Sequence, residues 1–505
     1  MGCRSICSTA PRFGLRQRKS LLVVVFVAAC NHGVYSLGAG PIDDSPLASG
    51  GMTSKIINVG SSPGGGSVTT GGTSSAAIST GGSTTGGVAL SSGGKASVAD
   101  ASCATGGLNA TADILSVSSD GTVGNQSSDQ PGLSADGRVV VFTSAADNLV
   151  PGDTNGVSDV FALNRDTGSI VRISVGPSGA QFDASSSMPA LSPDTTRIAF
   201  VTAASNVATD ASAGRMVIVS TAFNAGLSGF SSGLTAVTAL DANADSSYPM
   251  LGNGGSLIVF RSQAANLVAG DTNGREDFFT VNPKSGVTSR IITASDDSGF
   301  VIDGCAPKLS ADGSTLAFCG HLGSAPQNVS VVRLATGKSQ LAGVTASGAA
   351  SSGACYSPAL TANGNSIAFV CDADDIVSGD TNGLADVFVR NLTSGVTTRL
   401  TDQGAESQVP GMNPAISGDG RRVVFQRGQQ PNDPTSLYYG INTFDLECDS
   451  LIAFFVGTGI GTLGSTIPLS ELSLNDNGDT LVATAGSISS TANSQIIALS
   501  YSQLP

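Results

Sequence analysis

One segment of the chain recurs seven times, and this repetition constrains the fold more than any other feature. Each copy starts at an apolar anchor residue, has Gly four positions later in six copies, and has Phe nine positions later in six copies. The anchors are Leu133, Leu191, Leu251, Leu309, Leu360, Ile416 and Leu474. The spacing inside a copy is constant while the distance between copies varies, which is expected when one supersecondary unit is kept and its surface loops differ in length.

Each copy is predicted to be a small antiparallel sheet. In the first copy, Asp136-Gly137 supplies the positive φ angles of a tight hairpin turn, and the run RVVVF at 138–142 is β-branched and aromatic. Two further runs, at 159–163 and 169–175, have the composition of strands. With the short segment at the anchor, a copy has four antiparallel strands, and this is the make-up of a propeller blade.

The last copy lacks one strand, and the start of the chain can supply it. After 481–485 only the run at 495–502 remains, whereas a strand-like run at 113–119 precedes the first copy. Pairing these two runs would close the ring and remove both exposed sheet edges. We therefore predict an all-β fold, a seven-bladed β-propeller over 109–505 that is closed by an N-terminal strand. Six blades is the alternative, if the last copy is a decayed edge piece.

The region before the propeller is predicted to be an export signal and a tether. Residues 1–29 carry five basic residues, no acidic one, and an apolar run at 21–29 that is too short to span a bilayer as a helix. The tetrapeptide at 27–30 resembles a bacterial lipobox, which implies lipidation of Cys30; cleavage nearby with Cys30 as a bystander is the alternative. Residues 30–108 are rich in Gly, Ser and Thr, so we expect a disordered, flexible linker.

The charge and the predicted signal peptide indicate where the protein acts. The chain has 24 basic and 38 acidic residues; removing residues 1–29 deletes five basic ones, and 19 minus 38 gives a charge of −19. Such acidity argues against nucleic-acid binding, because it repels phosphate backbones. We expect an exported monomer in the periplasm or on the cell surface, which touches the membrane only through its N-terminal lipid.

Six cysteines remain once the signal peptide and the lipidation candidate are set aside. An even number in an exported chain indicates pairing, and in antiparallel neighbours the start of one strand lies beside the end of the next. We expect the disulfides Cys305–Cys319, Cys355–Cys371 and Cys103–Cys448. The third would staple the ring closure. Free thiols are the alternative for each pair.

The segments 189–202, 307–320 and 414–427 resemble the WD40-like (PD40) repeat of TolB-type propellers. The resemblance implies an exported bacterial β-propeller in a family used mostly for protein–protein contacts in the cell envelope. Two departures from TolB stand out. The α/β domain that precedes the TolB propeller is replaced by the tether, and seven blades are expected where TolB has six. Binding to TolB's lipoprotein partner is therefore not carried over, since fold alone does not fix function.

A GDTNG motif followed by Asp occurs in the first, third and fifth copies and is the candidate metal site. Its oxygens have the one, three, seven spacing of a calcium loop, and its glycine allows the tight turn that such a loop needs. The positions are Asp153, Asn155 and Asp159, then Asp271, Asn273 and Asp277, then Asp380, Asn382 and Asp386. The motif looks like a shortened form of the calcium loops in integrin-type propellers, without their additional acidic position. An Asx turn that holds no metal is the alternative.

Catalytic patterns are sparse in the sequence. Beyond the signal peptide there are two histidines, His32 and His321, and the G-x-S-x-G match at 229–233 lies in a Gly/Ser-rich stretch where a nucleophile elbow has no strand and helix to sit between. We therefore predict a binding or scaffold module for an envelope protein or peptide, with no enzymatic activity and no cofactor beyond calcium. The alternative is a hydrolase with carboxylates at the channel mouth, for which Asp241, Asp245 and Glu406 are candidates.

Overall fold

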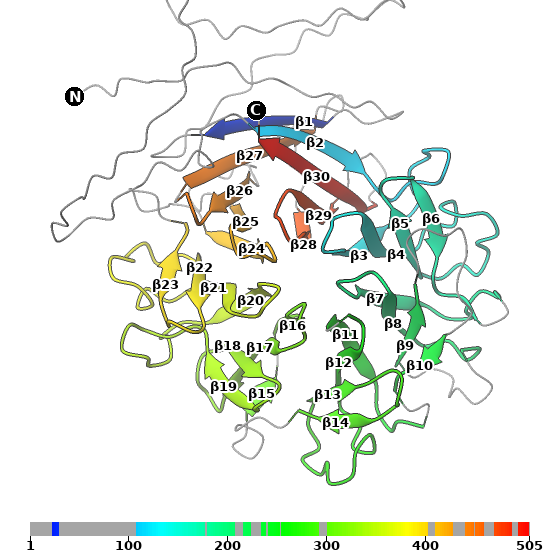
Figure 1. Cartoon of the computed structure of the whole chain (residues 1–505), viewed down its shortest axis with the longest axis horizontal. Helices are drawn as coiled ribbons and strands as arrows, with labels where there is room; N and C mark the ends of the chain where they lie inside the picture. Colours follow the sequence, from blue (N-terminus) through cyan, green and yellow to red (C-terminus); the bar gives the residue numbers. More distant parts are fainter. Residues whose placement is uncertain are drawn as a thin grey trace, which may run out of the picture. The chain divides into compact units, whose positions relative to one another are not determined.

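Seven small antiparallel sheets stand around a common centre in the computed structural model (Figure 1). The structure describes residues 23–29, 108–176, 179–207, 216–223, 234–238, 241–252, 254–291, 300–302, 304–401, 410–427, 440–448, 450–458, 469–486 and 493–503. All the regular elements in these ranges are strands. No helix long and apolar enough to cross a membrane occurs in the described part of the chain.

The first blade shows how one repeat folds. Its strands run from the centre outwards as β3 (Ser128–Leu133), β4 (Val139–Ser144), β5 (Asp159–Asn164) and β6 (Ser169–Arg172). All six residues of β4 are buried, as is expected of a strand that packs against neighbouring blades on both faces. The outermost strand has no fully buried residue.

The remaining blades repeat this order, and their bounds are as follows. The second blade has β7 (Ser186–Leu191), β8 (Arg197–Thr202), β9 (Val217–Ala222) and β10 (Thr235–Ala236); the third has β11 (Ser246–Gly252), β12 (Leu257–Ser262), β13 (Asp277–Val281) and β14 (Thr288–Arg290); the fourth has β15 (Phe300–Ile302), β16 (Lys308–Leu309), β17 (Thr315–Leu322), β18 (Asn328–Arg333) and β19 (Lys338–Leu341); the fifth has β20 (Cys355–Leu360), β21 (Ser366–Cys371), β22 (Asp386–Asn391) and β23 (Thr397–Arg399); the sixth has β24 (Gly411–Ile416), β25 (Arg422–Arg427), β26 (Gly440–Asp445) and β27 (Ser450–Thr458); the seventh has β28 (Leu469–Leu474), β29 (Thr480–Ala485), β30 (Gln495–Gln503) and β2 (Leu108–Ile114).

The phenylalanine nine positions after the anchor lies in the core of the blade in the six copies that have it. In the first blade Phe142 lies opposite Phe161 on the next strand, with ring centroids 5.7 Å apart and both side chains fully buried. The pair Phe369 and Phe388 repeats this contact at 5.7 Å in the fifth blade. Burial of one such ring contributes about 1.5–3 kcal/mol, and the ring pair adds about 0.5–1.5 kcal/mol.

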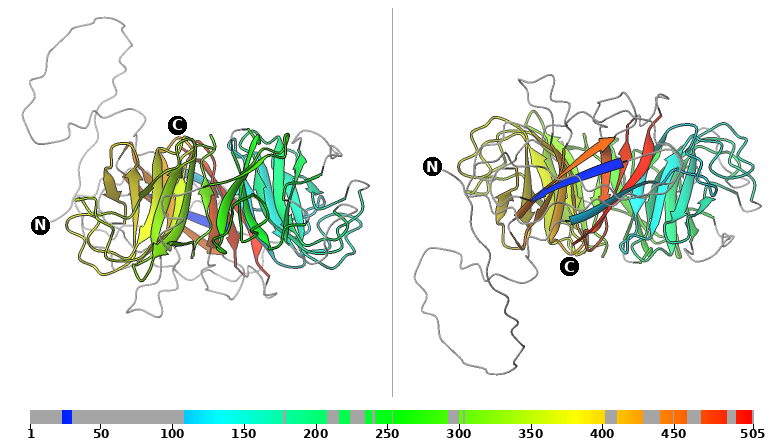
Figure 2. Two further views of the ribbon diagram at one scale, coloured as in Figure 1. Left: turned by 90° about the horizontal axis from the view of Figure 1, so that it is seen from below. Right: turned by 90° about the horizontal axis from the view of Figure 1, so that it is seen from above.

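The hairpin turns form one end of the propeller, which we call the turn end. Gly137 has the predicted positive φ of 74°, and Thr195, at the one position without glycine, also takes a positive φ of 57°. The opposite end, the loop end, carries the long connections between the second and third strands of a blade and the links from one blade to the next (Figure 2). The GDTNG motifs lie at the loop end.

The ring closes as predicted, because β2 from the start of the propeller pairs antiparallel with β30 from its end. Seven blades are confirmed, and the six-blade alternative is wrong. The closing strand covers 108–114 and not the predicted 113–119. The second half of the predicted range has left the sheet, because Val117 pairs with Val123 in a short hairpin. At the turn end, the amide of Asp476 donates to the carbonyl of Ala135 over 2.9 Å and joins the last blade to the first.

The apolar run that we predicted to be an export signal is a strand in this structure. β1 (Val23–Ala29) pairs antiparallel with β27 as a fifth strand on the outside of the sixth blade (Figure 1). The rest of residues 1–29, the tether at 30–107 and the lipidation candidate Cys30 lie outside the described residues. The signal peptide, the tether and the lipid therefore stay predictions.

Candidate functional site

Each GDTNG motif gathers its predicted residues around an arginine. In the first blade the Arg172 Nη1 lies 3.0 Å from the Asp153 Oδ1 and 3.6 Å from the Asp159 Oδ2. The Asn155 Nδ2 donates to the Asp159 Oδ2 over 3.1 Å, while the Asn155 Oδ1 accepts the amide of Val157. The Asn155 side chain, which the sequence analysis predicted to bind a cation, thus stabilises a turn of the chain itself.

The other two motifs are built in the same way. Arg290 Nη1 lies 3.0 Å from Asp271 and 3.4 Å from Asp277. Arg399 Nη1 lies 2.5 Å from Asp380 and 3.4 Å from Asp386. The asparagines Asn273 and Asn382 donate to Asp277 and Asp386 over 3.0 Å and 3.4 Å. In all three motifs the arginine follows the first aspartate by 19 residues, a spacing that is visible in the sequence.

This arrangement does not fit a calcium ion. The guanidinium lies between the two carboxylates, and the asparagine oxygen is used by a backbone amide, so few oxygens are free for a hard cation that takes six to eight. Burial, and then the charge of Asp386, raises the pKa of Asp380 to about 6, with Arg399 acting in the opposite direction. No group of three or more His, Cys, Asp or Glu that could hold a metal ion occurs among the described residues. Calcium binding stays a prediction.

Two of the three predicted disulfides are confirmed. Cys305–Cys319 and Cys355–Cys371 are bonded, with Cα atoms 5.5 Å and 4.0 Å apart. Cys448 is disulfide-bonded too, but its predicted partner Cys103 lies outside the described residues, so that pair stays a prediction.

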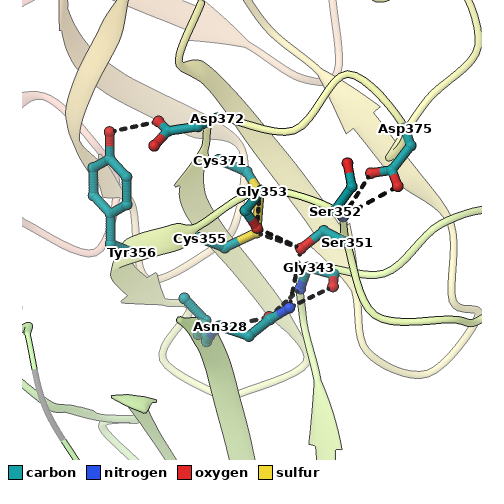
Figure 3. The surroundings of a disulfide bond; sticks show 11 residues. Asn328, Gly343, Ser351, Ser352, Gly353, Cys355, Tyr356, Cys371, Asp372 and Asp375 are labelled. Atoms are coloured by element: carbon teal, nitrogen blue, oxygen red, sulfur yellow. Dashed lines mark hydrogen bonds between the residues drawn. A yellow bond between two sulfur atoms is a disulfide. The ribbon is translucent and has the colours of Figure 1, made fainter. Parts of the chain in front are cut away.

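The Cys355–Cys371 disulfide links the innermost and second strands of the fifth blade at the loop end (Figure 3). The Ser351 Oγ lies 3.2 Å from the Cys355 Sγ and accepts a hydrogen bond from the Asn328 Nδ2 over 3.1 Å. Asn328 comes from the fourth blade, so this disulfide is tied to the neighbouring sheet. Its surroundings indicate a structural staple.

The innermost strands carry a feature that the sequence analysis did not identify. In six blades this strand is bulged, and the residue three positions before the anchor has a positive φ of 48–55° although it is not glycine. These residues are Gln130, Met188, Tyr248, Ser357, Asn413 and Glu471. A bulge turns a side chain away from its regular direction, and non-glycine residues in this conformation concentrate at functional sites.

Two of the bulge side chains bond to the next blade. The Gln130 Oε1 accepts the amide of Met188 over 2.7 Å, which joins the first blade to the second. The Glu471 Oε2 accepts the amide of Gln130 over 2.7 Å and the Thr484 hydroxyl over 2.7 Å, which joins the last blade to the first. The contact between the last and first blades thus has the same form as the contact between the first and second blades, with the Glu471 carboxylate in place of the Gln130 side-chain amide.

The innermost strands that the structure describes carry three charged residues, which we call the axial cluster: Asp129, Lys308 and Glu471. Burial, and then the charge of Glu471, raises the pKa of Asp129 to about 6. Lys308 is exposed to solvent by area, yet the surrounding protein desolvates its ammonium group and lowers its pKa, while Glu471 opposes that change. A solvent-accessible side chain with a desolvated ammonium group is expected where a residue lines a water-filled space enclosed by protein.

The three residues come from separate blades. Asp129 is on β3, Glu471 on β28, and Lys308 on β16, whose blade lies across the ring from β28 (Figure 1). Lys308 and Glu471 interact electrostatically although their blades lie on opposite sides of the ring. A carboxyl group that titrates near neutral pH, beside a second carboxylate and opposite an ammonium group, can hold a cation or exchange a proton.

The aligned repeats contain the information that would have identified this cluster. Directly before the anchor, Lys308 stands where the other copies have Gly, Ala, Met or Ser. Three positions before the anchor, Glu471 is the one charged residue in seven copies, and four positions before it, so is Asp129. Of the acids predicted from the sequence, Asp241 and Asp245 are not part of this cluster. The Asp245 Oδ1 accepts the amide of Met216 over 3.0 Å, the carbonyl of Asp241 accepts a hydrogen bond from Asn266, and Glu406 lies outside the described residues.

The described part of the chain is thus a seven-bladed β-propeller with a charged axial cluster. No protein-family model matches the sequence, and no curated protein matches it. Among solved structures, the fold is similar to an oligogalacturonate lyase in complex with manganese, at 13% identity and a TM-score of 0.50, over 79% of this chain and 95% of that one.

Other similar structures include both TolB proteins and peptidases. A putative TolB from Agrobacterium tumefaciens is similar at 15% identity and a TM-score of 0.36, over 68% of this chain and 97% of that one. A prolyl endopeptidase is similar at 12% identity and a TM-score of 0.45, over 78% of this chain. The chain spans about half (51%) of that endopeptidase. The predicted seven-bladed β-propeller is confirmed as the fold.

The comparisons correct one prediction. The prediction that the chain is not an enzyme is contradicted, because an enzyme, the oligogalacturonate lyase, shares this propeller fold. Identities of 12–15% show the fold alone and assign no reaction. The propeller is compatible with binding and with catalysis, and the choice depends on the site.

Proposed function

We propose that this chain is an exported binding module of the bacterial cell envelope, whose propeller holds a partner protein or peptide at the loop end. In this proposal the signal peptide directs export, Cys30 carries the lipid, and the tether lets the propeller reach its partner. The axial cluster receives a positively charged group of the partner, an ammonium or a guanidinium.

The observation that carries the proposal is the state of Asp129. Its carboxyl is partly buried beside Glu471, and both effects raise its pKa to about 6. A cation placed between the two carboxylates would relieve their repulsion and replace the lost solvation of Asp129. Such a group is attracted to the site without any rearrangement of the ring, because the Glu471 carboxylate is already held by Gln130 and Thr484.

The test is capture of partners from envelope extract by three forms of the protein. The first is the exported wild type, the second carries Asp129→Asn with Glu471→Gln, and the third carries Asp166→Asn as a matched control. Asp166 is an exposed acid at the turn end, where it pairs with Arg138. We expect a partner that the wild type and the control retain and the axial variant loses. Equal capture by all three forms would refute a role for the axial cluster.

A second function, carboxylate chemistry at the same cluster, is favoured by one observation. A carboxyl with a pKa of about 6 next to another carboxylate is suited to general acid and base catalysis near neutral pH. The proteins above should be assayed against chromogenic glycosides, esters and oligogalacturonate between pH 4 and 8. Turnover that disappears in Asp129→Asn but persists in Asp166→Asn would establish this function, and its absence across the panel would count against it.

A further inference from the structure

The sixth blade ends in an unusually long outer strand. In the first, second, third, fourth and fifth blades, the outermost strands β6, β10, β14, β19 and β23 have four, two, three, four and three residues. The outermost strand of the sixth repeat, β27, has nine residues. Short outer strands protect a sheet from pairing with other chains, and β27 lacks this protection.

The sequence of β27 adds to its capacity for pairing. SLIAFFVGT has no charged residue and no proline, and its centre consists of Ile, Ala, Phe, Phe and Val. Charged residues and proline are the usual means of preventing an edge strand from accepting another strand. A long, uncharged edge rich in β-branched and aromatic residues is a template for strand addition.

The structure shows such an addition. β1, with the sequence VVVFVAA, pairs with the outer edge of β27 in one uninterrupted antiparallel register, from Val23 opposite Thr458 to Ala29 opposite Ile452 (Figure 1). However, β1 lies within the predicted signal peptide. Processing between residues 29 and 30 would remove all seven residues and open this edge.

We infer that in the processed protein the outer edge of β27 binds an extended, uncharged, β-branched segment of a partner polypeptide, which pairs antiparallel in the place of β1. The register of β1 defines the chemistry and length of this segment, about seven residues. The site lies on the outside of the sixth blade and uses backbone groups, so it is independent of the axial cluster. It gives the propeller a second means of holding a partner.

Amide hydrogen exchange of the exported protein tests this inference. Mass spectrometry first establishes whether the chain begins at residue 30. The probe is a synthetic peptide of residues 22–30 flanked by lysines for solubility, and the control is the same peptide with Val25→Pro and Val27→Pro. The β26 register covers only 450–454 of β27, and the β1 register covers 452–458. We therefore expect rapid exchange at 455–458 and at the outward-facing amides of 452–454 in the free protein. The amides that face the probe should slow roughly tenfold with the probe but not with the control peptide. Exchange in β23 should stay unchanged.

Three results would overturn the inference. Equal slowing by both peptides would mean that pairing with the backbone is not involved. Slow exchange at 450–458 before peptide is added, in protein that retains residues 23–29, would mean that the chain's own strand stays in place. The same slow exchange in processed protein, together with a concentration-dependent dimer, would mean that a second copy covers the edge.

Discussion

Replacement of Asp129 by asparagine should stabilise the fold at neutral pH, and the effect can be estimated from the structure. Burial and Glu471 raise the pKa of Asp129 from 3.8 to about 6. Because the folded-state value exceeds the unfolded one, the folded protein binds this proton more tightly. The stability that the proton contributes is complete below pH 3.8 and is lost as the pH rises through 6.

A shift of roughly two units corresponds to about 3 kcal/mol. Since the side chain is partly exposed, solvent screening reduces this figure to about 1–2 kcal/mol. Asp129→Asn removes the charge and keeps the shape, so we expect the variant to be more stable than wild type by about 1–2 kcal/mol at pH 7.5. At pH 4.5 most of that difference should disappear, because wild-type Asp129 is then protonated in the folded state.

The assay is urea unfolding followed by far-ultraviolet circular dichroism, since the chain has no tryptophan to report by fluorescence. Asp166→Asn serves as the control and should be neutral at both pH values. Adding Glu471→Gln should reduce the gain from Asp129→Asn, because the two carboxylates repel each other. A gain of equal size at pH 4.5 and 7.5, or no gain at either, would refute the reasoning about the axial cluster.

Three further predictions concern the loops and the disulfide. Arg399→Ala should lower the free energy of unfolding by about 3 kcal/mol, because it leaves Asp380 and Asp386 buried without their cation, and Arg399→Lys should lower it by less; denaturant melts check both. Chelator should leave the melting temperature of the wild type unchanged, whereas a drop that calcium reverses would support metal binding after all. Cys355→Ala with Cys371→Ala should cost about 3 kcal/mol by the same melts, given the separation of 16 residues, and loss of less than 1 kcal/mol would argue that the bond is dispensable.

The fold was largely predictable because the sequence repeats it seven times. The constant spacing from the anchor to the turn glycine and to the phenylalanine specifies the hairpin and its register, and the two confirmed disulfides follow from that register. The start of the closing strand was not predictable in the same way. LNATADI at 108–114 alternates apolar and polar residues, but two of its four apolar positions are alanine and it directly follows the Gly/Ser/Thr-rich region, so the strand signal is weak. Backbone pairing with β30 places this segment in the sheet.

The site was harder to predict for a physical reason. Repeat analysis shows what the copies share, while the axial cluster consists of residues at which single copies differ: Asp129, Lys308 and Glu471. They influence one another because the ring brings the innermost strands of three blades around one centre, and no local motif encodes that. The arginines beside the GDTNG motifs were missed because the partner is 19 residues away, on the outermost strand, and a search for metal ligands considers oxygens only.

The most direct test of the central claim is a calorimetric titration of the captured partner against the propeller at pH 5 and pH 7.5. If the axial carboxylates receive a cationic group, the affinity of the wild type should fall roughly tenfold or more as Asp129 becomes protonated, and Asp129→Asn should bind weakly with no such pH dependence. An affinity that is the same at both pH values, or a pH dependence that Asp129→Asn retains, would contradict the account.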